Sequence, residues 1–196
     1  MHLIDTLLTR YLRKFNSKHM QLQPLENFRP EAEPGKEYLL YIHVPFCESL
    51  CPFCSFHRVR FDDHRAKRYF EALRKEVLNY HEAGFVFSDI YVGGGTPTVL
   101  PEELAEILNL VRNLYDIKSI SVETNPNHLR QDTLDILKDA GVTRLSVGVQ
   151  SLDDKLLKEM GRYDSYGSSS EIIDNLRLTQ GQFDTFNVDM IFNIPH

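Results

Sequence analysis

The chain has little of several features that would each point to a different class of protein. It contains no tryptophan, and its net charge of −6 leaves no excess of positive charge. Acidic and basic residues are interleaved along the predicted helices, which argues against a nucleic-acid-binding protein with a broad basic face. No run approaches the ~18 apolar residues of a membrane span. Polar residues interrupt the N-terminus, so we expect no secretory signal peptide.

Cysteine is also scarce, and its distribution is more informative than its number. The three cysteines are Cys47, Cys51 and Cys54. An odd, clustered set is a poor disulfide framework and instead indicates a metal or redox role in a reducing compartment. We therefore expect a cytoplasmic protein. The alternative, that these are inert buried thiols, is disfavoured because all three cysteines lie within residues 47–54, close to Pro45 and Pro52.

The N-terminal segment 1–36 is predicted to be a helix followed by a linker. Apolar residues recur at helical spacing over residues 3–15, opposite basic residues. A transit peptide or a membrane-surface helix would show this pattern, but a helix that docks on the domain or on a partner is favoured. Pro24, Pro30 and Pro34 mark the linker.

The remainder, 37–196, alternates between short β-branched or aromatic runs and amphipathic helices. Strands are expected at 38–44, 87–92, 118–124, 144–149 and 186–192. One helix is expected at 64–82, a second begins at Pro101, and a third ends at Ala140 before Gly141. A fourth begins at Ser151 and a fifth at Ser168, with Glu171 in capping-box spacing. This alternation predicts an α/β fold with a parallel sheet, either open or curled into a barrel. Because the chain ends just after the fifth strand, we expect a fragment of a longer protein.

Unusual residues follow the ends of successive predicted strands. The cysteines follow the first strand, GGGTPT (93–98) follows the second, Glu123 ends the third and Gln150 follows the fourth. Functional loops of parallel α/β folds lie at the C-terminal ends of the strands. We therefore expect these residues to form a single site.

The C-x3-C-x2-C cluster suits two kinds of metal site. Zinc would take the three thiolates and His57 in a tetrahedron. An iron–sulfur cluster would take one thiolate for each of three irons and leave a fourth iron open to a ligand. A glycine-rich loop and a lone carboxylate on neighbouring strands favour the iron–sulfur alternative, because a structural zinc site needs neither.

Six motifs in order resemble the radical S-adenosylmethionine (SAM) superfamily, and more narrowly the oxygen-independent coproporphyrinogen III oxidase family. They are YIHVPFCESLCPFC (41–54), GGGTPT, ETNP (123–126), RLSVGVQS (144–151), GR (161–162) and NVDMIF (187–192). The family includes haem chaperones and anaerobic haem methyltransferases. The resemblance implies a partial (β/α)6 TIM-like barrel, truncated after about the fifth strand, with an N-terminal helical extension.

The resemblance also implies a set of roles. Cys47, Cys51 and Cys54 would hold a [4Fe–4S] cluster whose open iron binds SAM, and reduction would release a 5′-deoxyadenosyl radical. SAM contacts are implied for Tyr41, Phe53, Gly94, Gly95, Thr96 and Glu123, and contacts to a possible second SAM for Gln150, Arg162 and Asp189. From the residues alone, Glu123 also fits a solvated strand-end acid, Arg162 an exposed helix-end arginine, and Asp189 a buried acid that needs a partner.

Three departures from the family leave the reaction open. SFHRVRF (55–61) follows the last cysteine, where the oxidases usually have Gly-Cys-Asn; Tyr163 and Asp164 follow the GR motif; and Asn193 replaces a glycine. The resemblance implies a tetrapyrrole substrate or haem, and an electron donor such as flavodoxin or ferredoxin. The leading hypothesis is oxidative decarboxylation of propionates. The alternatives are a haem-degrading methyltransferase and a haem chaperone, for which His43, His57 and His64 are candidate ligands.

Overall fold

The chain divides into two compact units, Met1–Pro30 and Glu31–His196. The computed structural model describes residues 2–19 and 30–193. The first unit contains helix α1 (His2–His19), as the periodicity predicted. Its described apolar side chains are exposed, among them Leu7, Leu8, Tyr11, Leu12 and Phe15. The linker prediction around Pro24 lies outside the described residues.

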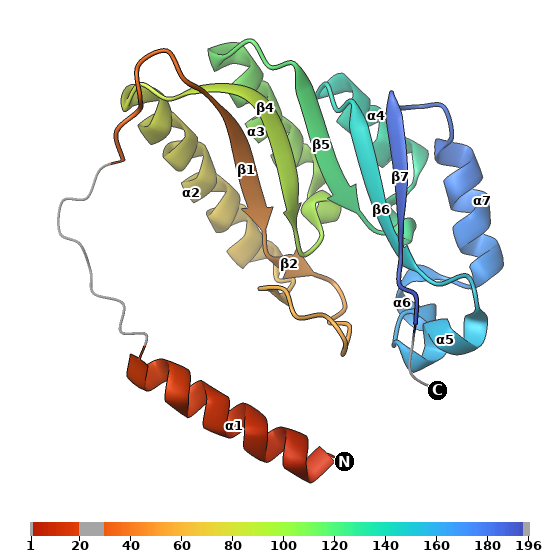
Figure 1. The fold of residues 1–196 in the computed structure, drawn as a ribbon. Coiled ribbons are helices and arrows are strands. Elements are labelled where there is room, and N and C mark those ends of the chain that lie inside the picture. The colour runs from red at the N-terminus through yellow and green to blue at the C-terminus, as the bar shows by residue number, and fades with distance from the viewer. Residues whose placement is uncertain (1, 20–29, 194–196) are drawn as a thin grey trace. The chain divides into compact units, whose positions relative to one another are not determined.

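The second unit contains a five-stranded sheet with the order β1-β4-β5-β6-β7. Its strands are β1 (Glu37–Val44), β4 (Val86–Gly94), β5 (Ser119–Thr124), β6 (Arg144–Gln150) and β7 (Thr185–Met190). Every neighbouring pair is parallel. The predicted α/β class and all five predicted strands are confirmed, with bounds shifted by one or two residues. Because the strands are parallel, their carboxyl ends reach the same edge of the sheet (Figure 1).

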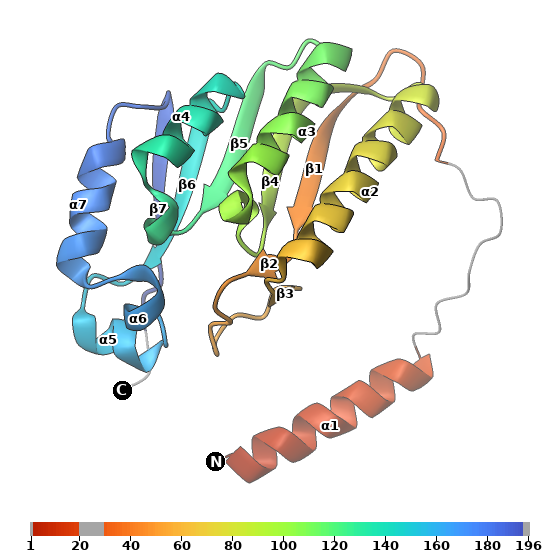
Figure 2. The same cartoon turned by 180° about the vertical axis from the view of Figure 1, so that it is seen from behind.

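Helices cover one face of this sheet, as Figure 2 shows from that side. They are α2 (Asp63–Glu82), α3 (Pro101–Leu114), α4 (Gln131–Asp139) and α7 (Ser169–Thr179). Short helices α5 (Asp154–Glu159) and α6 (Tyr163–Tyr166) and the 3-10 turns η1 (Pro97–Val99) and η2 (Pro126–His128) lie in loops. The core lies between this helical layer and the sheet.

Period-two alternation along the strands sorts apolar from polar side chains. Ile90 and Val92 of β4 and Val122 of β5 are buried under the helices and contact residues such as Leu108. The intervening residues Tyr91 and Glu123 lie on the opposite face and remain partly exposed. The face that the helices leave uncovered therefore carries the polar side chains that a binding site can use.

Local signals explain where the helices begin. Pro101 occupies the first turn of α3, and the Asp62 side chain accepts a hydrogen bond from Arg65 N at the start of α2. Ser168 and Glu171 form the predicted capping box of α7. At the end of α4, Gly141 adopts φ = 83°, as expected of a residue beyond a helix.

Two parts of the fold differ from the sequence-based expectation. The helix expected from Ser151 begins at Asp154, because Asp153 accepts hydrogen bonds from the first backbone amides of α5. Strands β2 (Phe46–Cys47) and β3 (Val59–Arg60) form a separate two-stranded parallel ladder that was not predicted. Each strand has only two residues, too few for a hydrophobic period to be visible.

Within the described residues, the structure contains no helix of the length and apolarity needed to span a membrane.

Replacing Leu108 with alanine is predicted to lower the free energy of unfolding by about 2–5 kcal/mol, because this side chain is fully buried between α3 and the sheet. Leu178→Ala is the matched control, since Leu178 is 47% exposed on α7. Its effect should stay within about 0.5 kcal/mol. Urea denaturation followed by circular dichroism measures both. Equal losses would contradict this placement of the core.

Candidate functional site

A cavity of about 440 Å³ lies at the carboxyl ends of the strands. Ten of the twelve residues predicted from sequence line it: Cys47, Cys51, Phe53, Cys54, Gly94, Gly95, Glu123, Gln150, Arg162 and Asp189. They come from the cysteine loop, from β4, β5, β6 and β7, and from the N-terminus of α6. Thr96 is buried and contacts Cys47, whereas Tyr41 lies on β1 and does not line the cavity.

The β2–β3 ladder and local hydrogen bonds hold the cysteine loop. Phe61 N donates to Cys47 O at 2.8 Å, and Cys54 N donates to Cys51 O at 3.2 Å. Arg58 also donates to Cys51 O. All three thiols are free; Cys47 and Cys51 are buried, and Cys54 is partly exposed. Burial is the main cause that raises the pKa of the Cys47 thiol. The loop thus presents three unoxidised sulfurs to one cavity.

The glycine-rich loop runs against the cysteine loop at backbone contact. Gly95 N donates to Val44 O, and Thr96 N donates to Phe46 O, each at 2.7 Å. A Cβ added at Gly95 would lie 2.7 Å from Phe46 O and 2.9 Å from Cys47 Sγ. No side chain fits in that space. The third glycine of the motif is therefore required for the two loops to approach each other.

Glu123 is held on both of its oxygens. Tyr91 donates its hydroxyl to Oε1 at 2.6 Å, and Gly94 N donates to Oε2 at 3.3 Å. Burial, together with the hydrogen bond to Glu123, raises the pKa of Tyr91 to about 12. Glu123 is half-buried, so the alternative of a freely solvated strand-end acid is wrong. Its carboxylate is fixed at the cavity wall.

Arg162 is buried, with 4% of its surface exposed. The alternative of an exposed helix-end arginine is therefore wrong. Its Nη1 donates to Cys51 Sγ at 3.3 Å, and its Nη2 donates to Asn125 Oδ1 at 3.2 Å and to Gly148 O. Its guanidinium lies 4.0 Å over the Tyr166 ring. One cation thus links the cysteine loop to the loop after β5 and to strand β6.

Two further predicted polar residues, Gln150 and Asp189, also line the cavity. Asp189 is exposed on the edge strand β7, so the expectation of a buried acid is wrong. It does have partners: Ser146 Oγ donates to it at 2.9 Å and Asn187 Nδ2 at 2.7 Å. Gln150 has φ = 73°, an uncommon conformation for a non-glycine residue. This conformation ends β6 and coincides with a register shift against β7.

The aromatic residues predicted to contact SAM are both exposed. Phe53 lines the cavity and is 43% exposed. Tyr41 is 53% exposed on the open face of β1, where it stacks on Tyr91 at 6.0 Å and its hydroxyl lies 3.0 Å from His43 Nδ1. His43 Nε2 lies 3.0 Å from His57 O. Both ring nitrogens of His43 therefore have partners already.

Sequence reasoning missed several residues of the site. Asn125 is buried and donates to Thr96 Oγ1 at 2.8 Å while it accepts from Arg162. It belongs to the ETNP motif, so a signal for it was present. Tyr166 also lines the cavity, and its burial raises its pKa. No sequence signal marked Tyr166 as part of the site, although its contact with Arg162 joins residues four positions apart in one helical turn.

Glu48, which follows the first cysteine, was also not singled out. It accepts hydrogen bonds from Asn127 at 2.8 Å and lies 2.9 Å from His128 Nε2. Burial acts to raise the pKa of Glu48, but the hydrogen bonds from His128 and Asn127 outweigh it and lower this pKa. These contacts attach the cysteine loop to η2, at a point separate from Arg162.

The cavity fits a cluster-bound ligand on three observations. Three free thiols line it, and two glycines leave its wall without side chains. Arg162 Nε is buried and has no hydrogen-bond partner in the described part of the chain, and Arg162 lines the cavity, which indicates a donor available to an acceptor group. His57, the fourth ligand of the zinc alternative, lines a different pocket. Among the described residues, no group of three His, Cys, Asp or Glu is placed to hold a single metal ion.

Comparison with known proteins adds a family match. The model of the radical SAM superfamily matches residues 41–196. The heme chaperone HemW of Bacillus subtilis (strain 168) is 35% identical over 79% of this chain and 42% of its own length. The oxygen-independent coproporphyrinogen III oxidase of Escherichia coli (strain K12) is 31% identical over 83% of this chain and 36% of its own length.

Solved structures agree with this match. Coproporphyrinogen III oxidase (HemN) from Escherichia coli superposes with a TM-score of 0.71 at 30% identity, covering 82% of this chain and 38% of that one. The methyltransferase TsrM from Kitasatospora setae reaches 0.54 at 15% identity and supports the fold alone. The chain thus spans about two fifths of the length of these two curated relatives, HemW and the oxidase.

Replacing Arg162 with leucine is predicted to destabilise the protein by about 1–3 kcal/mol for each buried acceptor that loses its donor. Asn125 Oδ1 and Gly148 O are the acceptors concerned. The control is Arg177→Leu on α7, where the side chain is 74% exposed and pairs with Asp174 alone. Chemical denaturation measures both variants. If both unfold at the wild-type midpoint, Arg162 does not link the loops as described.

Proposed function

The chain belongs to the radical SAM superfamily, and we propose that it binds a [4Fe–4S] cluster and SAM to carry out radical chemistry on a tetrapyrrole. Cys47, Cys51 and Cys54 would each bind one iron of the cluster. The cluster and SAM are the cofactors of this superfamily. The resemblance to the superfamily that the ordered motifs indicated is confirmed by the match over residues 41–196. The observation that carries the proposal is the convergence of ten predicted site residues on one cavity.

When bound, the cluster and SAM supply a 5′-deoxyadenosyl radical by one-electron cleavage of the sulfonium. The protein's task is to orient and enclose them. Gly94 and Gly95 let the methionine part of SAM approach the backbone, and the fixed carboxylate of Glu123 accepts hydrogen bonds from the ligand. Phe53, which lines the cavity, would shield one side of the bound ligands from water and so protect a reactive radical.

Arg162 would offer a bound ligand the N–H groups that its contacts within the protein leave unused. Its two terminal nitrogens are already engaged by Cys51, Asn125 and Gly148. The buried Nε–H and the second N–H of Nη1 are the donors that remain for a ligand. Gln150 and Asp189 line the same cavity as Arg162, so a second SAM molecule would contact these three side chains together. We therefore propose that the cavity also binds a second SAM molecule.

The reaction proposed first is oxidative decarboxylation of propionate side chains, as in oxygen-independent coproporphyrinogen III oxidase. It is supported by the similarity to that enzyme's fold. A haem-degrading methyltransferase would use the same cavity, and the segment SFHRVRF is where this chain departs from the oxidases. We place the protein in the cytoplasm, because three free cysteines persist best in a reducing compartment.

A haem chaperone is the second candidate function, because the relative at 35% identity is named as one. In that case haem would need an accessible axial ligand. His57 and His64 are exposed and line one pocket, whereas both ring nitrogens of His43 are already hydrogen-bonded. His57 and His64 are therefore the better candidates of the three histidines.

The first test is release of 5′-deoxyadenosine. Protein reconstituted anaerobically with iron and sulfide, then given dithionite and SAM, should produce it, as measured by chromatography and mass spectrometry. Cys54→Ala should reduce the yield to that of protein without iron, because one cluster ligand is lost. Absence of the product from fully loaded protein would overturn the enzymatic proposal. Stable haem binding in that same preparation would then support the chaperone.

A second test concerns the position of Glu123. Tyr91→Phe removes the hydroxyl that donates to Oε1, and we expect the dissociation constant for SAM to rise about 3- to 10-fold, as for loss of one hydrogen bond. Tyr115→Phe is the control, since it removes a hydroxyl that contacts His81 instead. Isothermal titration of cluster-loaded protein gives both constants. Unchanged affinity in Tyr91→Phe would show that Glu123 does not need this partner.

A further inference from the structure

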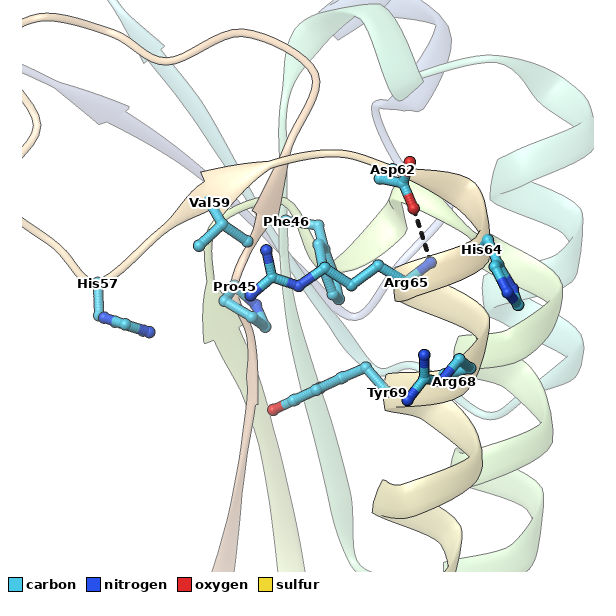
Figure 3. Close-up of a pocket in the computed structure, with 9 residues that line it drawn as sticks. All are labelled: Pro45, Phe46, His57, Val59, Asp62, His64, Arg65, Arg68 and Tyr69. Carbon is cyan, nitrogen blue, oxygen red and sulfur yellow. Dashed lines mark hydrogen bonds between the residues drawn. The ribbon is translucent and has the colours of Figure 1, made fainter.

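A second pocket, of about 650 Å³, lies beside the cysteine loop and apart from the candidate site. Its lining residues are Pro45, Phe46, His57, Val59, Asp62, His64, Arg65, Arg68 and Tyr69. Figure 3 shows Arg65, Arg68 and Tyr69 projecting from the first turns of α2, with His57 on the opposite side. None of these residues has a role in the proposed radical chemistry.

The segment around this pocket has the opposite charge to the chain as a whole. Residues 55–68 contain five arginines and lysines against two aspartates, although acidic residues outnumber basic ones overall. Arg60, Arg65 and Arg68 are exposed, and we call these three the arginine patch. Lys67 is paired with Asp63. Among the described residues, no side-chain ion pair or side-chain hydrogen bond involves the patch guanidinium groups.

Two arginines of the patch, Arg65 and Arg68, line the pocket together with an apolar floor. Pro45 and Phe46 are buried, and Val59 is partly exposed beside them. Protein–protein interfaces commonly consist of an apolar centre inside a polar rim, with arginine enriched. The lining therefore fits an acidic protein that inserts a side chain into the pocket while its carboxylates meet the arginines.

The patch is also connected directly to the proposed cluster ligands. Arg60 of β3 is the register partner of Cys47 in β2. Phe61, the next residue, donates its amide to Cys47 O at 2.8 Å. Only the short β2–β3 ladder would therefore lie between a protein bound at the patch and Cys47, a proposed cluster ligand.

We propose that the arginine patch and its pocket bind an acidic one-electron carrier protein of the flavodoxin or ferredoxin class. This inference rests on the proposed function, whose chemistry needs one electron for each SAM cleaved. In the transfer the carrier is oxidised by one electron and the cluster is reduced by one, and no bond is made or broken between the proteins. Weak electron-transfer complexes bury little surface, less than about 1,200 Å², and a small patch with one pocket is sufficient for them.

Charge complementarity sets the expected behaviour of this complex. Opposite charges accelerate the encounter of two proteins, and salt screens the attraction between exposed groups. Binding of the carrier should therefore weaken steeply as ionic strength rises. Reduction of the cluster by dithionite, a small molecule, should not depend on the patch.

The test compares two triple variants of the cluster-loaded protein. One reverses the patch: Arg60→Glu, Arg65→Glu and Arg68→Glu. The control makes the same change in net charge at exposed positions elsewhere, Lys118→Glu, Lys155→Glu and Arg177→Glu, where the side chains are 61%, 85% and 74% exposed. An intermediate variant, for use if the charge reversals affect folding, combines Arg60→Ala, Arg65→Ala and Arg68→Ala.

Two quantities are measured against a purified flavodoxin. The dissociation constant of oxidised flavodoxin is obtained by biolayer interferometry, and the rate of cluster bleaching by flavodoxin hydroquinone is obtained by anaerobic stopped flow. We expect the patch variant to bind 10- to 100-fold more weakly and to be reduced correspondingly more slowly. The control should change either quantity less than threefold. Equal losses in the two variants would overturn the proposal, because only net charge would then matter.

A dithionite arm separates this inference from the proposed function. If dithionite yields 5′-deoxyadenosine from the patch variant and from wild type alike, while flavodoxin distinguishes them, the docking site is supported. If dithionite yields none from wild type, the proposed function fails, whatever the binding data show. Patch variants that retain flavodoxin binding but lose affinity for a porphyrin would overturn the docking proposal and assign the arginines to tetrapyrrole carboxylates.

Discussion

Parallel pairing of five strands is the constraint on which the rest of the structure depends. Four strands bring different chemical groups to the same edge of the sheet: thiols after β1, bare backbone at the end of β4, a carboxylate on β5 and an amide at the end of β6. Strand β7 adds a second carboxylate, Asp189. No two of these groups are close in sequence. The register of the sheet places the groups on β4, β5 and β6 side by side, because the buried apolar rows of neighbouring strands fix which residues are neighbours. The β2–β3 ladder holds the thiols beside them.

Hydrogen bonds between loops then hold the rim of the cavity. Arg162 contacts the cysteine loop, Asn125 and Gly148, while Glu48 attaches the cysteine loop to η2. The glycine-rich loop donates backbone hydrogen bonds to Val44 at the end of β1 and to Phe46, the residue before Cys47. An iron–sulfur cluster needs its ligands held in place, and these contacts fix the loop that carries the three cysteines.

Much of this could be predicted from the sequence, because the relevant signals are local or ordered along the chain. Strand alternation, Pro101 at the start of α3 and the capping box at Ser168 each depend on a few neighbouring residues. The motif order led to the cavity residues, and ten of twelve line it. The remainder depended on tertiary contacts: the burial of Arg162, the exposure of Asp189 on an edge strand, and the pairing of β2 with β3. No local pattern reports such contacts.

The segment SFHRVRF has two distinct roles in this account. Its sequence differs from that of the oxidases, and this difference left the reaction open. In the structure, the segment contributes Arg58 to the backbone of Cys51 and Arg60 to the exposed arginine patch. The loop that leads away from the cysteines thus braces the site on one side and offers charge to a partner on the other.

The central claim is that the open position at the cluster is occupied by SAM. Electron–nuclear double resonance on the reduced, cluster-loaded protein tests it most directly, using SAM labelled with ¹⁵N at the amino group. A ¹⁵N hyperfine coupling to the cluster spin that disappears with unlabelled SAM is the result predicted. A fully loaded, reduced cluster that shows no such coupling at saturating SAM would contradict the claim.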